Sequence, residues 1–318
     1  MTDTKACKFY TRPRNIILIA ILCTLLWGSA FPAIKSGYEL FQIGTNDVGS
    51  KILFAGFRFT LAGMVTLLVT FALNKRFIFL NKRNYKGILL LGFLQTFIQY
   101  YFFYIALGGM TGAKGSIINA TNTFMIVILS HFFFKSDRLN ARKVIGCILG
   151  FAGIVIISLT GEEDLGFSLT KEGYMLIASF SFAVGSIISK FITKNDDPMI
   201  TTGYQMTFGG ALLIIVGFLK DGKIGTMTPK GIALFIYMVL LSAVAFTLWS
   251  MLLKYNHVGK ISIYNSLNPV FDTILSGIIL GENVFRVKNM VALLCVAGGI
   301  YIVNKVREIP RVTQAEMA

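Results

Sequence analysis

Long apolar runs dominate the chain. Ten stretches are long enough and apolar enough to cross the roughly 30 Å hydrocarbon core of a bilayer as α-helices. They are residues 16–34, 53–73, 87–107, 115–134, 143–159, 173–192, 201–219, 231–253, 260–280 and 288–304. Only 14% of the 318 residues are charged, against about 25% in an ordinary soluble domain. The sequence therefore predicts an all-α integral membrane protein with ten transmembrane helices.

The charged residues lie mainly in the connectors between these runs. The chain has 30 Lys and Arg against 15 Asp and Glu, and most of the basic residues fall on the side of the N-terminus. Because cytoplasmic connectors are rich in Lys and Arg, we expect a multi-pass plasma-membrane protein with both termini in the cytoplasm and no nucleic-acid partner. These termini are the basic segment 1–15 and the tail 305–318. The connector 220–230 is basic on the opposite side and does not fit this arrangement.

The start of the chain has an alternative interpretation. Its basic residues are followed by NIILIAILCTLLWGSAF, which is similar to a cleaved secretory signal. Cleavage would leave nine spans and would upset the charge distribution described above.

An internal repeat divides the chain. When residues 116–156 are aligned with residues 262–302, Asn119 matches Asn265 and Asn122 matches Asn268. This alignment predicts two related halves, residues 1–160 and 161–318, with five helices each. Since five is odd, the second half would enter the membrane from the opposite side, as in the inverted repeats of secondary transporters.

Three stretches resemble the EamA-type family of the drug/metabolite transporter superfamily. They are WGSAFPAIK from Trp27, GFRFTLAG from Gly56, and NPVFDTILSGIILGENV from Asn268. The resemblance implies a transporter whose first, third, fourth, sixth, eighth and ninth helices border a central cavity. The first half departs from the pattern, with Thr123 in the place of Pro269 and Ser136 in the place of Glu282.

Polar residues form a stripe on the ninth predicted helix and another on the fourth. On an ideal helix, Asn265, Asn268 and Asp272 lie on one face, and Asn119 and Asn122 share a face of the fourth helix. Such stripes cannot face lipid, which offers no hydrogen-bond partners. They either line the cavity or hold helices together by hydrogen bonds.

Pro269 lies beside the ninth-helix stripe and removes a backbone donor there. The resulting kink would be a cavity hinge, a carbonyl available to substrate, or a purely structural bend.

Asp272 is the most unusual of the predicted cavity residues, because a charged group inside a membrane is costly and usually functional. Counted along its helix, Asp272 lies at a depth similar to that of Arg58 in the second span. The two side chains could form a buried ion pair. Alternatively, Asp272 could take up and release a proton during transport.

Further cavity candidates come from the first, sixth and eighth spans. They are Trp27, Ser29, Ser186 and Trp249, although the adjacent Gly28 and Gly185 also suit close helix packing. In the third span, Gln95 and Gln99 share one helix face and Tyr100 and Tyr104 share another. The sequence leaves open which of these faces meets the cavity.

The leading functional prediction is a secondary transporter that exports a small metabolite by alternating access, with proton coupling through Asp272. The substrate would be an amino acid, an amine or a related compound. We expect no cofactor, no metal and no enzyme activity, because the two histidines form no HExxH motif and the chain has no GxSxG. A non-transporting binding or scaffold protein and a passive facilitator are the alternatives.

Overall fold

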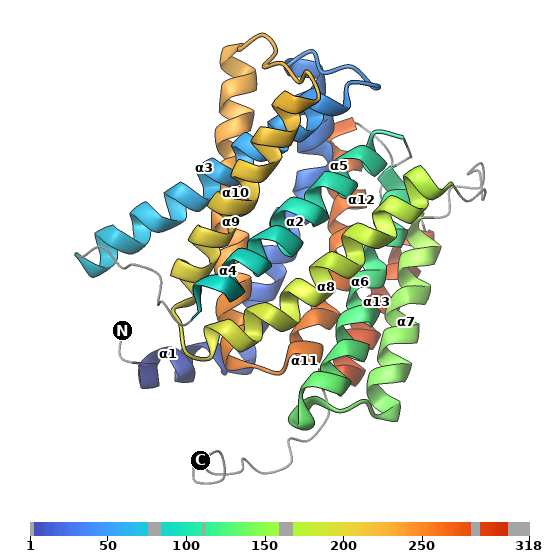
Figure 1. Cartoon of the computed structure of the whole chain (residues 1–318). Helices are drawn as coiled ribbons and strands as arrows, with labels where there is room; N and C mark the ends of the chain where they lie inside the picture. The colour runs from blue at the N-terminus through green and yellow to red at the C-terminus, as the bar shows by residue number, and fades with distance from the viewer. Residues whose placement is uncertain (1–2, 76–83, 110–111, 159–167, 281–286, 305–318) are drawn as a thin grey trace.

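A computed structural model describes residues 3–75, 84–109, 112–158, 168–280 and 287–304. Within these ranges the chain is helical and contains no strand (Figure 1). The tail 305–318 and the motif end at Gly281 and Glu282 lie outside the described residues. The prediction of an all-helical chain is confirmed for the part that the structure covers.

The helices of the first half are α1 (Asp3–Tyr10), α2 (Pro13–Leu40), α3 (Val48–Asn74), α4 (Tyr85–Leu91), the π-helix η1 (Gly92–Ile98), α5 (Gln99–Leu107), α6 (Gly112–Phe133), the 3-10 turn η2 (Lys135–Asp137) and α7 (Ala141–Ser158). Those of the second half are the π-turn η3 (Leu169–Gly173), α8 (Tyr174–Thr193), α9 (Pro198–Leu219), α10 (Pro229–Tyr255), α11 (Val258–Ser262), the 3-10 helix η4 (Ile263–Leu267), α12 (Asn268–Leu280) and α13 (Val287–Asn304). Each of the ten predicted spans coincides with one or more of these helices.

Six helical stretches of the described chain are long and apolar enough to cross a membrane. They are Pro13–Leu40, Val48–Asn74, Tyr85–Leu107, Leu169–Thr193, Pro198–Leu219 and Pro229–Tyr255. Large apolar side chains on these stretches are exposed, for example Leu68 at 63% and Ile215 at 55%. Exposed apolar residues along such helices are expected when the surrounding solvent is lipid rather than water.

Proline and capping side chains mark where several helices begin. α9 and α10 start at Pro198 and Pro229. The N–H groups in the first turn of a helix have no partner within the helix, so a proline there costs no hydrogen bond. Asp197 accepts a hydrogen bond from the backbone N–H of Met199 at 2.7 Å, and Thr228 accepts one from Gly231 at 3.1 Å. Both caps satisfy orphan donors at the helix ends.

The predicted span 260–280 is not one continuous helix. It divides into α11, η4 and α12, with the boundary at Asn268 and Pro269. Pro269 cannot donate to the turn before it, and the backbone N–H of Asn268 bonds to the carbonyl of Asn265 in the tighter 3-10 pattern. The predicted kink therefore takes the form of a change of helix type.

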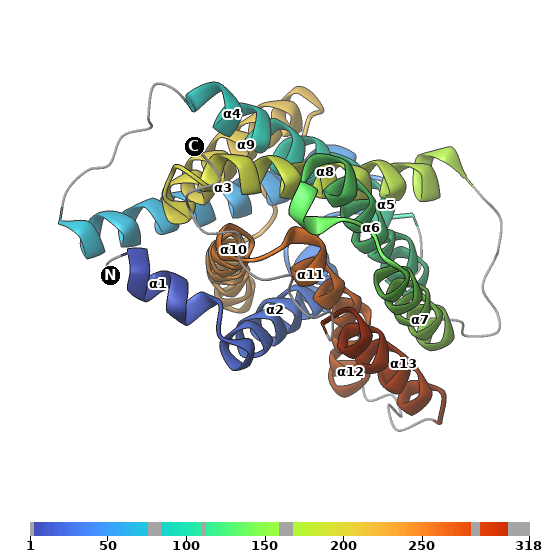
Figure 2. The ribbon, with the colours of Figure 1, turned by 90° about the horizontal axis from the view of Figure 1, so that it is seen from below.

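The ends of the bundle are distinct. α1, α11 and the α6–α7 connection lie at one end, and the α9–α10 connection lies at the other (Figure 1). Viewed along the bundle, α12 and α13 lie beside α6 and α7, whereas α3, α4 and α9 lie on the far side of α10 (Figure 2).

Glycines hold α3 and α9 in close contact. A Cβ atom on Gly63 would lie 2.5 Å from the backbone N of Thr207 and 2.6 Å from the carbonyl O of Gly203. A Cβ atom on Gly210 would lie 2.5 Å from the backbone N of Thr60. Real Cβ atoms do not approach so closely, so the pair packs backbone to backbone, as small residues allow inside membranes.

We expect Gly63→Ala to destabilise the protein by about 1–3 kcal/mol, because the added methyl forces α3 away from α9. Gly298→Ala on α13 is the matched control, since its Cβ would meet only the end of the Leu149 side chain, at 3.2 Å. Thermal unfolding in detergent should rank Gly63→Ala well below the control. Equal melting temperatures would show that the α3–α9 contact tolerates the extra atom.

Candidate functional site

A cavity of about 60 Å³ lies between seven helices near the centre of the bundle. It has room for a few water molecules, and its walls come from α2, α3, α5, α6, α8, α10 and α12. The residues that line it are Trp27, Ala30, Phe31, Ile34, Arg58, Gln99, Tyr100, Phe103, Asn119, Asn122, Phe182, Phe246 and Asn268. A smaller cavity of about 10 Å³ shares Phe31, Asn119, Asn122 and Asn268 with the first.

Several predicted site residues meet at these two cavities. Trp27, Asn119, Asn122, Arg58 and Asn268 line the larger one. The smaller one adds two more, Asn265 and Pro269. Asn119 and Asn268, which are 149 positions apart in the sequence, thus lie at the same two cavities. The sequence predicts that both asparagine stripes face inward, because lipid offers them no hydrogen-bond partners.

Three other candidates lie outside the two cavity linings. Trp249 packs behind Trp27, with ring centroids 5.1 Å apart. Ser29 Oγ is 2.5 Å from the hydroxyl of Tyr237 and links α2 to α10. Ser186 Oγ donates to the carbonyl of Phe182 in its own helix at 2.9 Å.

Asp272 is buried, with 7% of its surface exposed. It lies one helical turn beyond Asn268 on α12 and does not belong to either cavity lining. Its backbone N would be 3.0 Å from a Cβ atom on Gly28, so α2 and α12 approach closely at this level. Asp272 is therefore held where a movement of α12 against α2 would change its surroundings.

Arg58 is fixed by groups from two other helices. Its Nε donates to Ser242 Oγ at 2.9 Å and to the carbonyl of Met238 at 3.3 Å, and its Nη1 donates to the Tyr104 hydroxyl at 3.1 Å. The guanidinium carbon also lies 5.0 Å from the centre of the Phe59 ring. None of these contacts among the described residues is to Asp272.

Some N–H donors of the Arg58 guanidinium make no hydrogen bond to a described residue. A guanidinium has five N–H donors, and the hydrogen bonds to described residues use only the Nε donor and one at Nη1. The side chain is only 2% exposed, so its remaining donors can meet only what enters the interior.

Other polar atoms around the cavity are buried without a hydrogen-bond partner. Among the described residues these include Trp27 Nε1, Gln99 Oε1 and Asn268 Oδ1, which belong to cavity-lining side chains. Leaving such groups unsatisfied costs about 1–3 kcal/mol each. Orphaned donors and acceptors around one cavity are therefore suited to a polar ligand.

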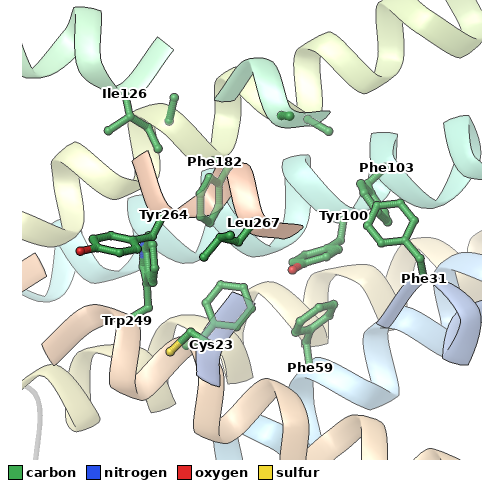
Figure 3. Close-up of a cluster of buried hydrophobic side chains, with 14 of the residues drawn as sticks. Cys23, Phe31, Phe59, Tyr100, Phe103, Ile126, Phe182, Trp249, Tyr264 and Leu267 are labelled. Atoms are coloured by element: carbon green, nitrogen blue, oxygen red, sulfur yellow. The ribbon is translucent and has the colours of Figure 1, made fainter. Parts of the chain in front are cut away.

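Apart from Ala30 and Ile34, the rest of the wall of the larger cavity is aromatic. Figure 3 shows Phe31 and Phe103 next to each other with Tyr100 nearby, and Phe59, which is outside the lining, packs against Tyr100. The Phe31 and Phe103 centroids are 5.4 Å apart, and those of Phe59 and Tyr100 are 4.0 Å apart. The site thus combines a cation, amide groups and apolar rings.

The sequence did not identify Phe31 or Gln99 as cavity residues. Phe31 precedes Pro32 inside α2, and an apolar ring in a membrane helix gives no signal of which way it points. Gln99 begins α5 directly after the π-helix η1. π-Helical turns often occur at functional sites, but no feature of the sequence predicted this one.

Comparison with known proteins gives a family match over almost the whole chain. The sequence model of the EamA-like transporter family matches residues 14–159 and, separately, residues 170–305. An uncharacterized transporter of Bacillus subtilis, YetK, is 27% identical over 79% of this chain and 77% of its own length. A probable amino-acid metabolite efflux pump of Escherichia coli is 26% identical over 90% of this chain and 93% of its own length. One solved crystal structure has a TM-score of 0.73 at 19% identity, covering 92% of this chain and 96% of the other, and so shares the fold.

Proposed function

Because the chain belongs to the EamA-like transporter family of the drug/metabolite transporter superfamily, we propose that it is a secondary transporter that exports a small metabolite by alternating access. The two relatives named above are described as an uncharacterized transporter and a probable amino-acid metabolite efflux pump. The observation that carries the proposal is the central cavity, where Arg58 and unsatisfied amide and indole groups meet aromatic walls. The substrate would be an amino acid, an amine or a related compound.

We propose that ten helices cross the plasma membrane as two inverted five-helix repeats, residues 1–160 and 161–318, with both termini in the cytoplasm. Two separate family matches, one in each half, support the duplication. The glycine contacts support the inversion. If α3 and α9 exchange places about a two-fold axis, the contact of Gly63 with Gly203 becomes the contact of Gly210 with Gly56, and the structure contains both.

The outward direction is supported by the relative described as an efflux pump. Alternating access is supported by the size of the cavity, since about 60 Å³ is well below the roughly 300–1,000 Å³ of a ligand site. A substrate must therefore enter and leave through a wider conformation. Asp272 would carry the coupling proton, because it is buried where α12 packs on α2.

Counterflow in proteoliposomes tests this proposal. Vesicles preloaded with unlabelled phenylalanine should accumulate labelled phenylalanine transiently, and the initial rate should saturate with concentration. A channel-like passive facilitator would give neither the overshoot nor the saturation. A scaffold protein would give no flux above empty vesicles. Either result would contradict the carrier.

Asp272→Asn tests the proton coupling separately. We expect the variant to retain counterflow but to lose the acceleration that a proton gradient gives to net transport, because Asn cannot carry a proton. Ser29→Ala, outside the cavity lining, is the control and should keep the acceleration. If Asp272→Asn responds to the gradient as fully as the unaltered protein, Asp272 does not carry the proton.

A further inference from the structure

We propose that the cavity selects substrates that carry a carboxylate beside an apolar, preferably aromatic, body, and that Arg58 holds the carboxylate. The inference rests on the proposed transport function and narrows its substrate class. It begins from the charges around the cavity. Arg58 is the one charged side chain in the larger lining, among the residues that the structure describes.

The described partners of Arg58 are all neutral. They are a serine hydroxyl, a tyrosine hydroxyl and a backbone carbonyl. A buried cation with neutral partners only is poorly compensated. An anion that entered the cavity would supply the missing charge.

The geometry of Arg58 suits a carboxylate. Ser242 and Met238 hold Nε while Tyr104 holds Nη1, so the plane of the guanidinium is fixed before any ligand arrives. The spare donors of a planar guanidinium match the two oxygens of a carboxylate, and such bidentate pairs are both strong and directional. A fixed donor group also loses little freedom on binding.

The same charge argues against an amine that lacks an acid group. An ammonium in the cavity would meet Arg58, and no carboxylate among the described lining residues would offset the repulsion. The α-ammonium of an amino acid is a different case, because the orphaned oxygens Gln99 Oε1 and Asn268 Oδ1 can accept from it. The carboxylate is therefore required, and the amino group is tolerated.

The body of the substrate would contact rings. Phe182 and Phe246 lie edge-on to Trp27, at centroid distances of 6.1 and 5.5 Å, and Phe31 lies edge-on to Phe103 at 5.4 Å. Offset and edge-to-face ring contacts add to the burial of apolar surface. An aromatic or large aliphatic group is thus favoured over a second polar group.

The two tryptophans of the chain make the test direct. Trp27 lines the cavity and Trp249 packs against it, and the sequence has no other tryptophan. Intrinsic fluorescence excited at the red edge of indole absorption therefore reports on the cavity alone.

Four probe molecules of similar size and different charge test the selectivity of the cavity. They are 3-phenylpropionate, phenylalanine, 3-phenylpropanamide and phenethylamine.

We expect the two carboxylates to change the fluorescence of the purified protein with dissociation constants at least tenfold below those of the amide and the amine. Such a gap is the scale of one charged hydrogen-bonded contact. In Arg58→Gln the gap should fall below about threefold, whereas Arg58→Lys should keep the preference with weaker binding, since Lys retains the charge without the fork. Tyr104→Phe should still bind the carboxylates more tightly than the amide and the amine, but by a smaller factor. The reason is that loss of the Tyr104 hydroxyl leaves the Arg58 guanidinium less firmly held.

Three results would overturn the inference. The unaltered protein could bind the amide or the amine as tightly as the carboxylates, Arg58→Gln could keep the full preference, or none of the four probes could alter the fluorescence at millimolar concentration. Counterflow of the same probes separates this inference from the transport proposal. Saturable counterflow of phenethylamine without any preference for carboxylates would support the transport proposal and contradict the carboxylate site. Carboxylate-selective binding without counterflow of any probe would support the carboxylate site and contradict the transport proposal.

Discussion

Replacing Lys143 by methionine is expected to lower the free energy of unfolding by about 3–5 kcal/mol, because it leaves a buried carboxylate without its cation. Asp137 and Lys143 are 2% and 6% exposed. Lys143 Nζ forms an ion pair with Asp137 Oδ1 and donates to the Asp137 carbonyl at 3.0 Å. The other carboxylate oxygen accepts from the backbone N–H of Gly259 at 2.7 Å, which ties the α6–α7 connection to α11. Loss of helical circular dichroism on titration with a denaturing detergent measures the effect.

Lys135→Met is the matched control, since Lys135 is an exposed lysine of the same connection. It should change stability by less than about 0.5 kcal/mol. The double variant Asp137→Leu with Lys143→Met should recover at least half of the loss, because it removes the unpaired charge as well. If Lys143→Met unfolds no earlier than Lys135→Met, the ion pair does not stabilise this end of the bundle.

The helices themselves could be predicted from the sequence, because a run of about twenty apolar residues in lipid has to satisfy its own backbone. The prediction failed in detail where the helix type changes. The ideal-helix stripe assumed 100° per residue throughout 260–280, but Asn265 lies in the 3-10 helix η4 and Asn268 begins α12. Pro269 signalled a kink, yet a proline alone does not say whether a helix bends or changes type.

The third span illustrates a second limit. A regular helix places Gln95 and Gln99 on one face, but Gln95 lies inside the π-helix η1, whose wider turn changes the angle between the two side chains. Gln99 and Tyr100 line the cavity, whereas the Gln95 side chain packs where Gly185 leaves space. The hydrophobic periodicity of the sequence does not reveal the π-helix. The sequence therefore could not predict which face of the third span meets the cavity.

Arg58 shows why partners are harder to predict than depths. Counting residues along a helix gives the height of a side chain in the membrane, and this placed Arg58 level with Asp272. It does not give the direction in which the side chain points around the bundle. That direction depends on how α3 packs against α10 and α5, which brings Ser242 and Tyr104 to Arg58. The pairing of Arg58 with Asp272 stays a prediction.

The four asparagines of the repeat form two pairs, and the structure shows a hydrogen bond within only one of these pairs among the described residues. Asn265 Nδ2 donates to Asn122 Oδ1 at 3.4 Å. Under the repeat alignment this contact corresponds to one between Asn119 and Asn268. Those two side chains line both cavities, as Asn122 does, but Asn268 Oδ1 has no hydrogen-bond partner among the described residues. Asn122 and Asn265 thus join the two halves by a hydrogen bond, whereas Asn268 keeps an acceptor that a ligand could use.

This division predicts opposite effects for two matched substitutions. Asn122→Leu should destabilise the protein by about 1–3 kcal/mol, because it strands the buried amide of Asn265. Asn268→Leu should change stability little, since it removes an acceptor that was already unsatisfied, but it should lower the initial rate of phenylalanine counterflow at least tenfold by removing a polar contact to the substrate. Detergent unfolding and counterflow on the same preparations measure both. A stability loss in Asn268→Leu as large as that in Asn122→Leu, with counterflow unchanged, would mean that Asn268 supports the fold and not the substrate.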